Sequence, residues 1–201
     1  MAHRLATLVT GASSGIGAAL AASFAREPSR VLILVARRTA PMYALAEELK
    51  TRFGTETEVI EADLEVPGAA AKLLAQVDQL GLTVDTLINN AGFGLNGPLH
   101  EMTVARVSGM LQLNITALTE LTHGVLPAMR ARRSGRILNI ASVAAFQPCP
   151  NFAAYGASKA YVLSFSEALA IELETSGITV TAVCPGSTAS GFHSVAGSDR
   201  S

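Results

Sequence analysis

The chain has 201 residues, of which 49% are apolar and 15% are charged, with a formal net charge of −1 at pH 7. This length suits one α/β domain spanning 1–201, and the balanced charge argues against a nucleic acid or an anionic membrane as a partner. Two cysteines without a CxxC pattern and four histidines without ligand-like spacing predict no disulfide, no metal site and a cytoplasmic protein.

Short β-branched or Leu-rich runs alternate with longer Ala-rich stretches that have helical spacing. This alternation predicts βαβ units, and no run is long enough to span a membrane. Strands are expected at 5–10, 31–36, 58–62, 84–89, 136–141 and 178–183. Helices are expected at 15–26, 41–53, 67–80, 103–133 and 151–176, the fourth kinked or split in its last turns by Pro127. The expected fold is a Rossmann-type, doubly wound parallel sheet of about six strands with helices on both faces.

A glycine-rich turn, TGASSGIG at 10–17, joins the first expected strand to the first expected helix. Its glycines permit a tight turn, and the free amides at the helix start favour a pyrophosphate. A plain turn is the alternative, but the position between strand and helix favours a dinucleotide. The expected cofactor contacts here are Gly11, Ser13, Ser14, Gly15, Ile16 and Gly17.

Arg37 and Arg38 follow the second expected strand, where NAD-binding proteins usually place a carboxylate on the ribose. Cations at this point favour a 2′-phosphate, so NADP is the expected cofactor and NAD the less favoured one. Two solvated arginines are the alternative interpretation. The absence of Asp and Glu from 31–38 favours the phosphate.

Tyr155 and Lys159 are four residues apart at the start of an expected helix, so their side chains share one face. An ammonium beside a phenol stabilises the phenolate and suits Tyr155 for acid/base chemistry. Ser142 ends the fifth expected strand at the ligand edge of the sheet. An ordinary helix face and a turn serine are the alternatives for these residues taken singly.

Together these residues resemble the short-chain dehydrogenase/reductase family over nearly the whole chain. The shared segments occur in that family's order and approximate spacing: the turn at 10–17, Asp63-Leu64, Asn89-Asn90-Ala91-Gly92, Asn114, Ser142, Tyr155-Gly156-Ala157-Ser158-Lys159 and Pro185-Gly186. The resemblance implies proton transfer by Tyr155 while hydride passes between the substrate and the nicotinamide. It also implies that Lys159 contacts the ribose and lowers the tyrosine pKa, and that Ser142 positions the carbonyl. Asn114, bent out of a long helix, would support a water in a proton relay.

The resemblance implies further cofactor contacts along the sheet edge. Asp63 is expected to hydrogen-bond adenine with Leu64 beside it, and Asn89 is expected to serve the framework. The other expected contacts are Asn90, Ala91, Gly92, Pro185, Gly186, Thr188 and Ser190. Thr188 and Ser190 stand where family members often hold the carboxamide with valine and threonine.

Family members usually continue for about fifty residues beyond this chain's last residue. We therefore expect an irregular tail at 186–201, no seventh strand, and a sixth strand left as an edge.

The leading expectation is an NADP(H)-dependent oxidoreductase acting on a small or medium apolar ketone or aldehyde, in a pocket formed by 93–97, 143–151 and the tail. The alternative is a cofactor-binding protein without turnover that serves as a sensor or partner subunit, and Tyr155 with Lys159 argues against a methyltransferase. A homodimer through 103–133 and 151–176 is expected from the resemblance.

Overall fold

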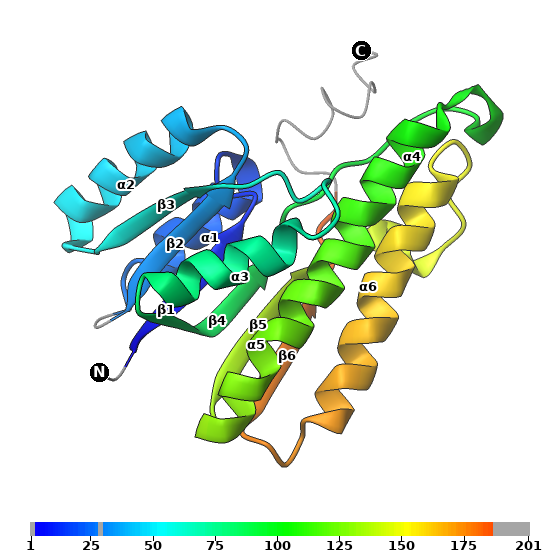
Figure 1. The fold of residues 1–201 in the computed structure, drawn as a ribbon. Helices are drawn as coiled ribbons and strands as arrows, with labels where there is room; N and C mark the ends of the chain where they lie inside the picture. The colour runs from blue at the N-terminus through cyan, green and yellow to red at the C-terminus, as the bar shows by residue number, and fades with distance from the viewer. Residues whose placement is uncertain (1–2, 28–29, 187–201) are drawn as a thin grey trace.

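The computed structural model describes residues 3–27 and 30–186. Within this part of the chain six strands form one parallel sheet in the order β3-β2-β1-β4-β5-β6 (Figure 1). The strands are β1 (Arg4–Thr10), β2 (Val31–Ala36), β3 (Thr57–Glu61), β4 (Leu82–Asn89), β5 (Gly135–Ile140) and β6 (Ile178–Val183). This is the doubly wound order, so the predicted fold class is confirmed.

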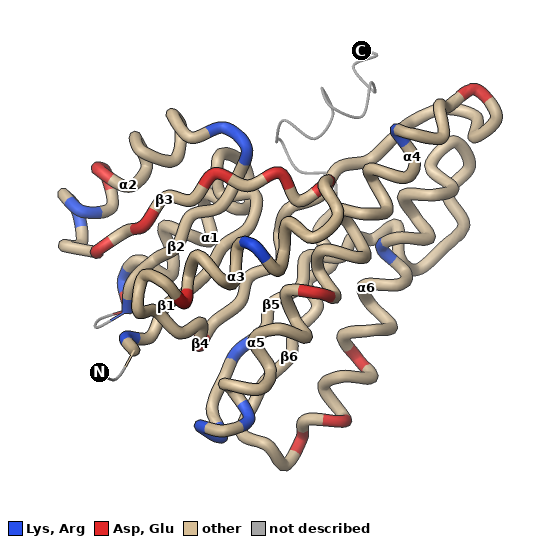
Figure 2. Tube along the Cα trace, in the orientation of Figure 1, with Lys and Arg blue, Asp and Glu red and all other residues tan. Residues whose placement is uncertain are grey.

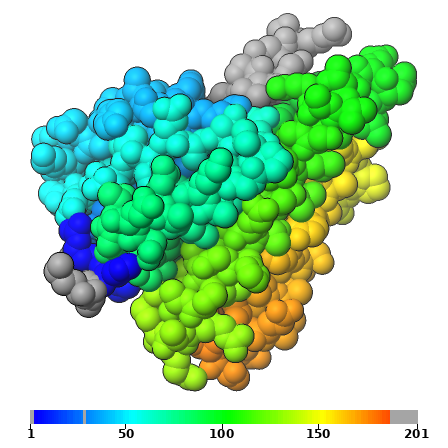
Figure 3. Space-filling view, viewed as in Figure 1, coloured from blue at the N-terminus to red at the C-terminus, as the bar shows by residue number. Residues whose placement is uncertain are grey.

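Helices cover both faces of the sheet. The α-helices are α1 (Gly15–Phe24), α2 (Thr39–Phe53), α3 (Ala69–Gln79), α4 (Val104–Leu111), α5 (Leu118–Arg132) and α6 (Ala153–Glu172). Short 3-10 turns, η1 (Leu99–Glu101) and η3 (Val143–Phe146), lie in loops where no helix was expected. Figure 3 shows side chains of α3, α5 and α6 closing over one face of the sheet.

The alternation of side chains along β2 explains how one apolar strand serves two cores. Leu32 and Leu34 pack into the cluster under α1 and α2, whereas Val31, Ile33 and Val35 pack into the cluster under α3, α5 and α6. Successive side chains of a strand point to opposite faces, so a strand buried on both faces must be apolar throughout. Figure 2 accordingly shows mostly uncharged residues along the middle of the sheet.

The long helical stretch 104–132 is irregular, as expected, but the irregular segment lies earlier in the chain than Pro127. α5 runs through Pro127 without being split, and the irregularity is a π-helix, η2 (Gln112–Ala117), directly after α4. Pro127 and His123, whose carbonyl loses its amide partner, are both exposed, so water can satisfy that oxygen. The expectation of a split at Pro127 is therefore wrong.

Ion pairs tie the elements together at the end of the sheet opposite the ligand edge. Asp85, 5% exposed, receives a 2.8 Å ion pair from Arg30, and Arg30 and Arg136 both pair with Glu27. These contacts join the loop after α1 to Asp85 within β4 and to Arg136 near the beginning of β5. No helix in the described part of the chain is both long enough and apolar enough to cross a membrane.

Candidate active site

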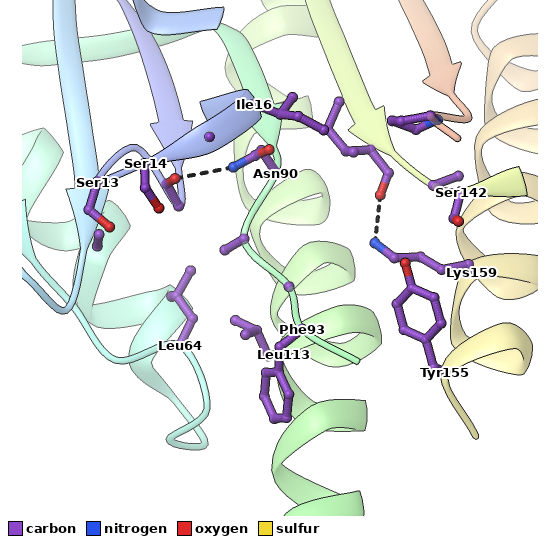
Figure 4. Close-up of a pocket in the computed structure, with 18 of the residues that line it drawn as sticks. Ser13, Ser14, Ile16, Leu64, Asn90, Phe93, Leu113, Ser142, Tyr155 and Lys159 are labelled. Carbon is purple, nitrogen blue, oxygen red and sulfur yellow. Dashed lines mark hydrogen bonds between the residues drawn. The ribbon is translucent and has the colours of Figure 1, made fainter. Parts of the chain in front are cut away.

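A cleft of about 790 Å³ lies at the carboxyl ends of the strands. Residues at or just beyond the end of each of the six strands line it, as the doubly wound topology requires. In Figure 4 Ser13 and Ser14 lie at one side of this cleft, and Ser142, Tyr155 and Lys159 lie across from them. The cleft therefore brings together the glycine-rich turn, the residues that follow β2, β3 and β4, and the group of Ser142, Tyr155 and Lys159. Gly17 and Asn114 were also predicted for the site but are not among the residues that line the cleft.

The glycine-rich turn has the geometry that a pyrophosphate needs. Gly11 has a φ of +68°, and a Cβ at Gly17 would lie 2.3 Å from the carbonyl oxygen of Gly11, which no side chain allows. Ser14 begins α1 without a side-chain cap, which leaves amides of the first turn available to an anion. Both the close packing and the open helix start fit a dinucleotide here.

Asn90 fastens this turn to β4. Its side-chain amide donates to the carbonyl oxygens of Thr10 at 2.9 Å and Gly11 at 3.3 Å. Figure 4 draws the bond to Gly11. The Thr10 hydroxyl in turn accepts hydrogen bonds from the backbone amides of Asn90 and Ala91. Asn90 thus shapes the turn as well as lining the cleft, and Thr10 is a support that the sequence analysis missed.

The two arginines after β2 have different partners. Nη1 of Arg37 lies 2.6 Å from Oε1 of Glu65 in an ion pair. Nη2 of Arg38 lies 3.4 Å from the hydroxyl oxygens of both Ser13 and Ser14. The sequence predicted the same role for both arginines, and no motif in it indicated Glu65 as a partner of either.

Asp63 and Leu64 line the cleft beyond β3, as expected. Leu64 is buried in the core. The Asp63 carboxylate accepts a 3.1 Å hydrogen bond from the backbone amide of Glu65, so it also holds the turn in which Glu65 stands. A carboxylate oxygen has further lone pairs, so this bond leaves Asp63 able to accept another donor.

Tyr155 and Lys159 project from the first turns of α6 into the same part of the cleft (Figure 4). The Lys159 Nζ lies 5.9 Å from the centroid of the Tyr155 ring and donates a 2.8 Å hydrogen bond to the Ile140 carbonyl. Burial lowers the pKa of Lys159 to about 8. Burial also raises the pKa of Tyr155 above its ordinary value, and the hydrogen bond with Ser142 opposes this in part.

The direction of the tyrosine shift differs from the expectation that the neighbouring ammonium lowers it. Tyr155 is only 9% exposed, and the loss of hydration of its phenolate outweighs the favourable contact with Ser142. A pKa above the ordinary value of about 10 keeps the Tyr155 hydroxyl protonated at neutral pH.

Ser142 follows β5 and caps the turn η3. Its hydroxyl oxygen accepts a 3.1 Å hydrogen bond from the Ala144 amide and also contacts Tyr155. Ser142 is therefore both the turn residue of the alternative interpretation and a cleft residue, as the resemblance implies. Its placement beside the phenol makes both hydroxyls available to one ligand oxygen.

Asn114 lies in the π-helical segment and is 1% exposed. Its Oδ1 accepts from the Phe93 amide at 3.2 Å, and its Nδ2 donates to the Phe93 carbonyl at 2.9 Å and to the Ser158 hydroxyl at 3.1 Å. A Cβ at Gly92 would lie 2.9 Å from that Oδ1, which explains the glycine. The π-helix displaces Asn114 from a regular helical position and lets it join the loop after β4 to α6.

Apolar side chains form the wall beside Tyr155. The Phe152 and Tyr155 rings meet edge to face with centroids 6.0 Å apart, and Phe93 packs in the same cluster. The Gly97 amide donates to the Asn151 carbonyl at 2.8 Å, which joins the two expected pocket segments. Phe152 lies one residue outside the predicted stretch 143–151, and its helical spacing of three from Tyr155 was the available signal.

Pro185 and Gly186 line the cleft as expected, and the Pro185 carbonyl accepts a 3.1 Å hydrogen bond from the Val143 amide. Thr188 and Ser190 lie outside the described residues.

A family model described as short chain dehydrogenase matches residues 5–201. The chain belongs to the short-chain dehydrogenase family. By class it is therefore an NAD(P)-dependent oxidoreductase.

Relatives and solved structures agree with this membership. The chain is 38% identical over 181 residues to sulfoacetaldehyde reductase 2 of Chromohalobacter salexigens, covering 89% of this chain and 71% of that protein. A short-chain dehydrogenase from Sphingobium yanoikuyae, solved with NADPH, superposes with a TM-score of 0.90 at 39% identity, covering 96% of this chain and 75% of that one. The bulky-bulky ketone specific alcohol dehydrogenase of Comamonas testosteroni gives 0.85 at 37% identity, covering 94% and 74%. The two solved structures share this fold with the protein.

Proposed function

We propose that this short-chain dehydrogenase interconverts a small or medium apolar ketone or aldehyde and its alcohol, with NADP(H) as the cofactor. The convergence of Tyr155, Lys159 and Ser142 across the cleft from the glycine-rich turn carries this proposal. In this proposal residues 1–201 form a single domain that both binds the cofactor and carries the catalytic residues. When bound, the nicotinamide ring of the cofactor supplies or accepts the hydride.

Tyr155 is the proton donor in the direction of reduction. Because burial raises its pKa, its hydroxyl remains protonated at neutral pH and can give a proton to a carbonyl oxygen. Ser142 supplies a second hydroxyl that orients this oxygen. Lys159, held by the Ile140 carbonyl, stands beside the phenolate that is left and stabilises it in its charged form.

The residues proposed to hold the cofactor follow the strand ends. The first turn of α1 receives the pyrophosphate, and the arginines after β2 favour the 2′-phosphate of NADP. Asp63 and Leu64 lie on the adenine side, and Lys159 and Asn90 to Gly92 lie nearer the nicotinamide side. Thr188 and Ser190 remain proposed contacts to the carboxamide.

The wall beside Tyr155 sets the proposed substrate class. Phe93, Val143, Ala144 and Phe152 give this wall apolar surface next to the two hydroxyls. Burial of apolar substituents contributes roughly 25 cal/mol per Å² of surface removed from water, so uncharged ketones with apolar groups are favoured. The Comamonas testosteroni relative is an alcohol dehydrogenase specific for bulky-bulky ketones, which supports a ketone as the substrate but not its small or medium size.

Loss of NADPH absorbance with purified protein tests the proposal. A panel should pair each apolar ketone or aldehyde with an analogue that carries a carboxylate, and oxidation is expected with the apolar member. NADPH-induced thermal stabilisation without oxidation of NADPH by any carbonyl compound would instead support the cofactor-binding protein without turnover. If NADPH neither stabilises the protein nor is oxidised in its presence, both functions are contradicted.

We also propose a homodimer formed through the outer faces of α5 and α6. Tyr161 and Ile171 on α6 are 38% and 74% exposed, although both are large apolar residues. Lys159 is the one charged residue in the amino-terminal half of α6, and it is buried. Figure 2 accordingly shows little charge along this half of the helix. A mass of twice 20.8 kDa in light scattering is expected, and a monomer at all concentrations would contradict the dimer.

We also propose that the protein is located in the cytoplasm, because Cys149 and Cys184 are both free thiols and the cytoplasm keeps thiols reduced.

A further inference from the structure

We propose that Glu65 determines how strongly the protein selects for the 2′-phosphate, because it occupies Arg37 and leaves Arg38 as the main phosphate ligand. This inference rests on the proposed use of NADP(H). It concerns the division of labour between two neighbouring arginines, which their sequence positions alone leave equal.

Arg37 is held by a carboxylate. Its Nη1 lies 2.6 Å from Oε1 of Glu65, and the Glu65 side chain is 21% exposed against 58% for Arg37. The other carboxylate oxygen of Glu65 lies against α4, since a Cβ at Gly109 would stand 2.9 Å from it. The missing side chain at Gly109 therefore makes room for Glu65 to reach Arg37.

The turn beyond β3 also fixes the backbone of Glu65. Its amide donates to the Asp63 side chain, and the Val66 amide donates to the Asp63 carbonyl at 3.2 Å. A side chain that is only 21% exposed and stands on a hydrogen-bonded turn loses less entropy when it forms an ion pair than an exposed side chain does. The pair with Arg37 is thus better organised than a contact between two freely rotating surface side chains.

Arg38 has a different environment. Its Nη2 contacts the neutral hydroxyls of Ser13 and Ser14 at 3.4 Å, which is long for a hydrogen bond. Such weak bonds are readily exchanged for shorter, charge-assisted bonds to an anion. No carboxylate in the described part of the chain pairs with Arg38, which is already directed at the glycine-rich turn. The two serines add hydroxyl donors to the same place.

The charges at this end of the cleft now predict unequal contributions. A phosphate monoester carries about −1.5 to −2 charges at neutral pH, so the Glu65 carboxylate repels it while neutralising Arg37. Arg38 attracts it without such opposition. Removal of the Glu65 charge should consequently release Arg37 and strengthen phosphate binding, whereas removal of Arg38 should abolish most of the selectivity.

Binding of 2′,5′-ADP and of 5′-AMP, measured by calorimetry, isolates the phosphate from catalysis. The quantity compared is the Kd of 5′-AMP divided by the Kd of 2′,5′-ADP, because the nucleotides differ only in the 2′-phosphate. A higher ratio means stronger selection for this phosphate. Arg38→Ala should lower this ratio by on the order of tenfold or more, and Arg37→Ala by less than about threefold. Glu65→Gln should raise it by roughly three- to tenfold. The double variant Glu65→Gln with Arg37→Ala should lose this gain.

Glu61→Gln is the matched control, because it makes the same change at an exposed carboxylate four residues earlier in the chain. It should leave the ratio within about twofold of the wild type. Equal losses in the two arginine variants, or a lower ratio in Glu65→Gln, would overturn the inference. If the wild type binds NADPH but its ratio is near one, NADP selectivity and the inference both fail, whereas carbonyl reduction with NADH would still stand. Failure to bind any of the nucleotides would overturn the inference together with the proposed function.

Discussion

The Nζ of Lys159 donates a 2.8 Å hydrogen bond to the carbonyl oxygen of Ile140, the last residue of β5. This bond ties the start of α6 to the strand that leads into Ser142. It places a buried amine beside the Tyr155 ring at the carboxyl edge of the sheet. The position of the amine is therefore set by the sheet as well as by the helix that carries it.

Lys159→Met should change the pH dependence of stability. Because burial lowers the pKa of Lys159 to about 8 from 10.5, the unfolded chain binds this proton more tightly than the folded protein does. The contribution of Lys159 to the free energy of unfolding therefore rises with pH from about 8 to about 10.5.

Relative to the wild type, the Met variant should be most stable at and below about pH 8 and should lose ground as the pH rises further. The lost bond to Ile140 adds an offset that does not depend on pH. Urea denaturation of both proteins across this range measures the difference. If the difference in unfolding free energy between the two proteins does not change with pH, the pKa of Lys159 is not lowered in the folded state.

Gly17→Ala should damage the cofactor turn directly. The new methyl group would meet the Gly11 carbonyl at 2.3 Å, and backbone cannot move aside as a flexible side chain can. We expect NADPH to bind on the order of tenfold more weakly or worse, and the free energy of unfolding to fall by about 1 to 3 kcal/mol.

Gly54→Ala is a suitable comparison because Gly54 has a φ of +70° and open space around its Cβ position. It should cost roughly 1 kcal/mol in unfolding free energy from backbone strain alone and leave NADPH affinity unchanged. Equal NADPH affinities in the two variants would argue against a specific role for the turn at Gly17.

Asn139→Ala should destabilise the protein through a buried polar network. The Asn139 side chain accepts from Asn89 at 2.9 Å and donates to the Ser166 hydroxyl at 2.9 Å, linking β4, β5 and α6. Its removal leaves buried polar atoms with fewer partners, and we expect a loss of roughly 2 to 4 kcal/mol in urea denaturation. Asn96→Ala, at an exposed position, should change the value by less than about 0.5 kcal/mol. A small loss at Asn139 would contradict the importance of this network.

The sheet was predictable because its pattern is local. Each strand is a short β-branched or Leu-rich run, and the alternation with helices fixes parallel pairing without any knowledge of contacts. The irregularity of the long helix was less accessible. Pro127 is an obvious local breaker but sits where water can satisfy the freed carbonyl, whereas Asn114 is placed by a π-helix that depends on contacts with Phe93 and Ser158.

The positions of the candidate site residues were largely predictable from motif spacing, but their electrostatic environments were not. The pKa of Tyr155 depends on how completely the phenol is buried, which its distance from Lys159 in sequence does not reveal. Similarly, Arg37 and Arg38 are equivalent in sequence, and only the folded turn beyond β3 brings Glu65 to one of them. Contacts between distant segments decide both points.

Tyr155→Phe tests proton transfer by Tyr155 most directly. It removes one oxygen from a buried ring and should lower kcat for carbonyl reduction by about 10²- to 10⁴-fold while NADPH affinity and the unfolding midpoint stay close to the wild type. Tyr161→Phe makes the same change six residues along α6, on the outer face where the hydroxyl bonds Thr119, and should retain activity. Wild-type turnover in Tyr155→Phe would contradict the account.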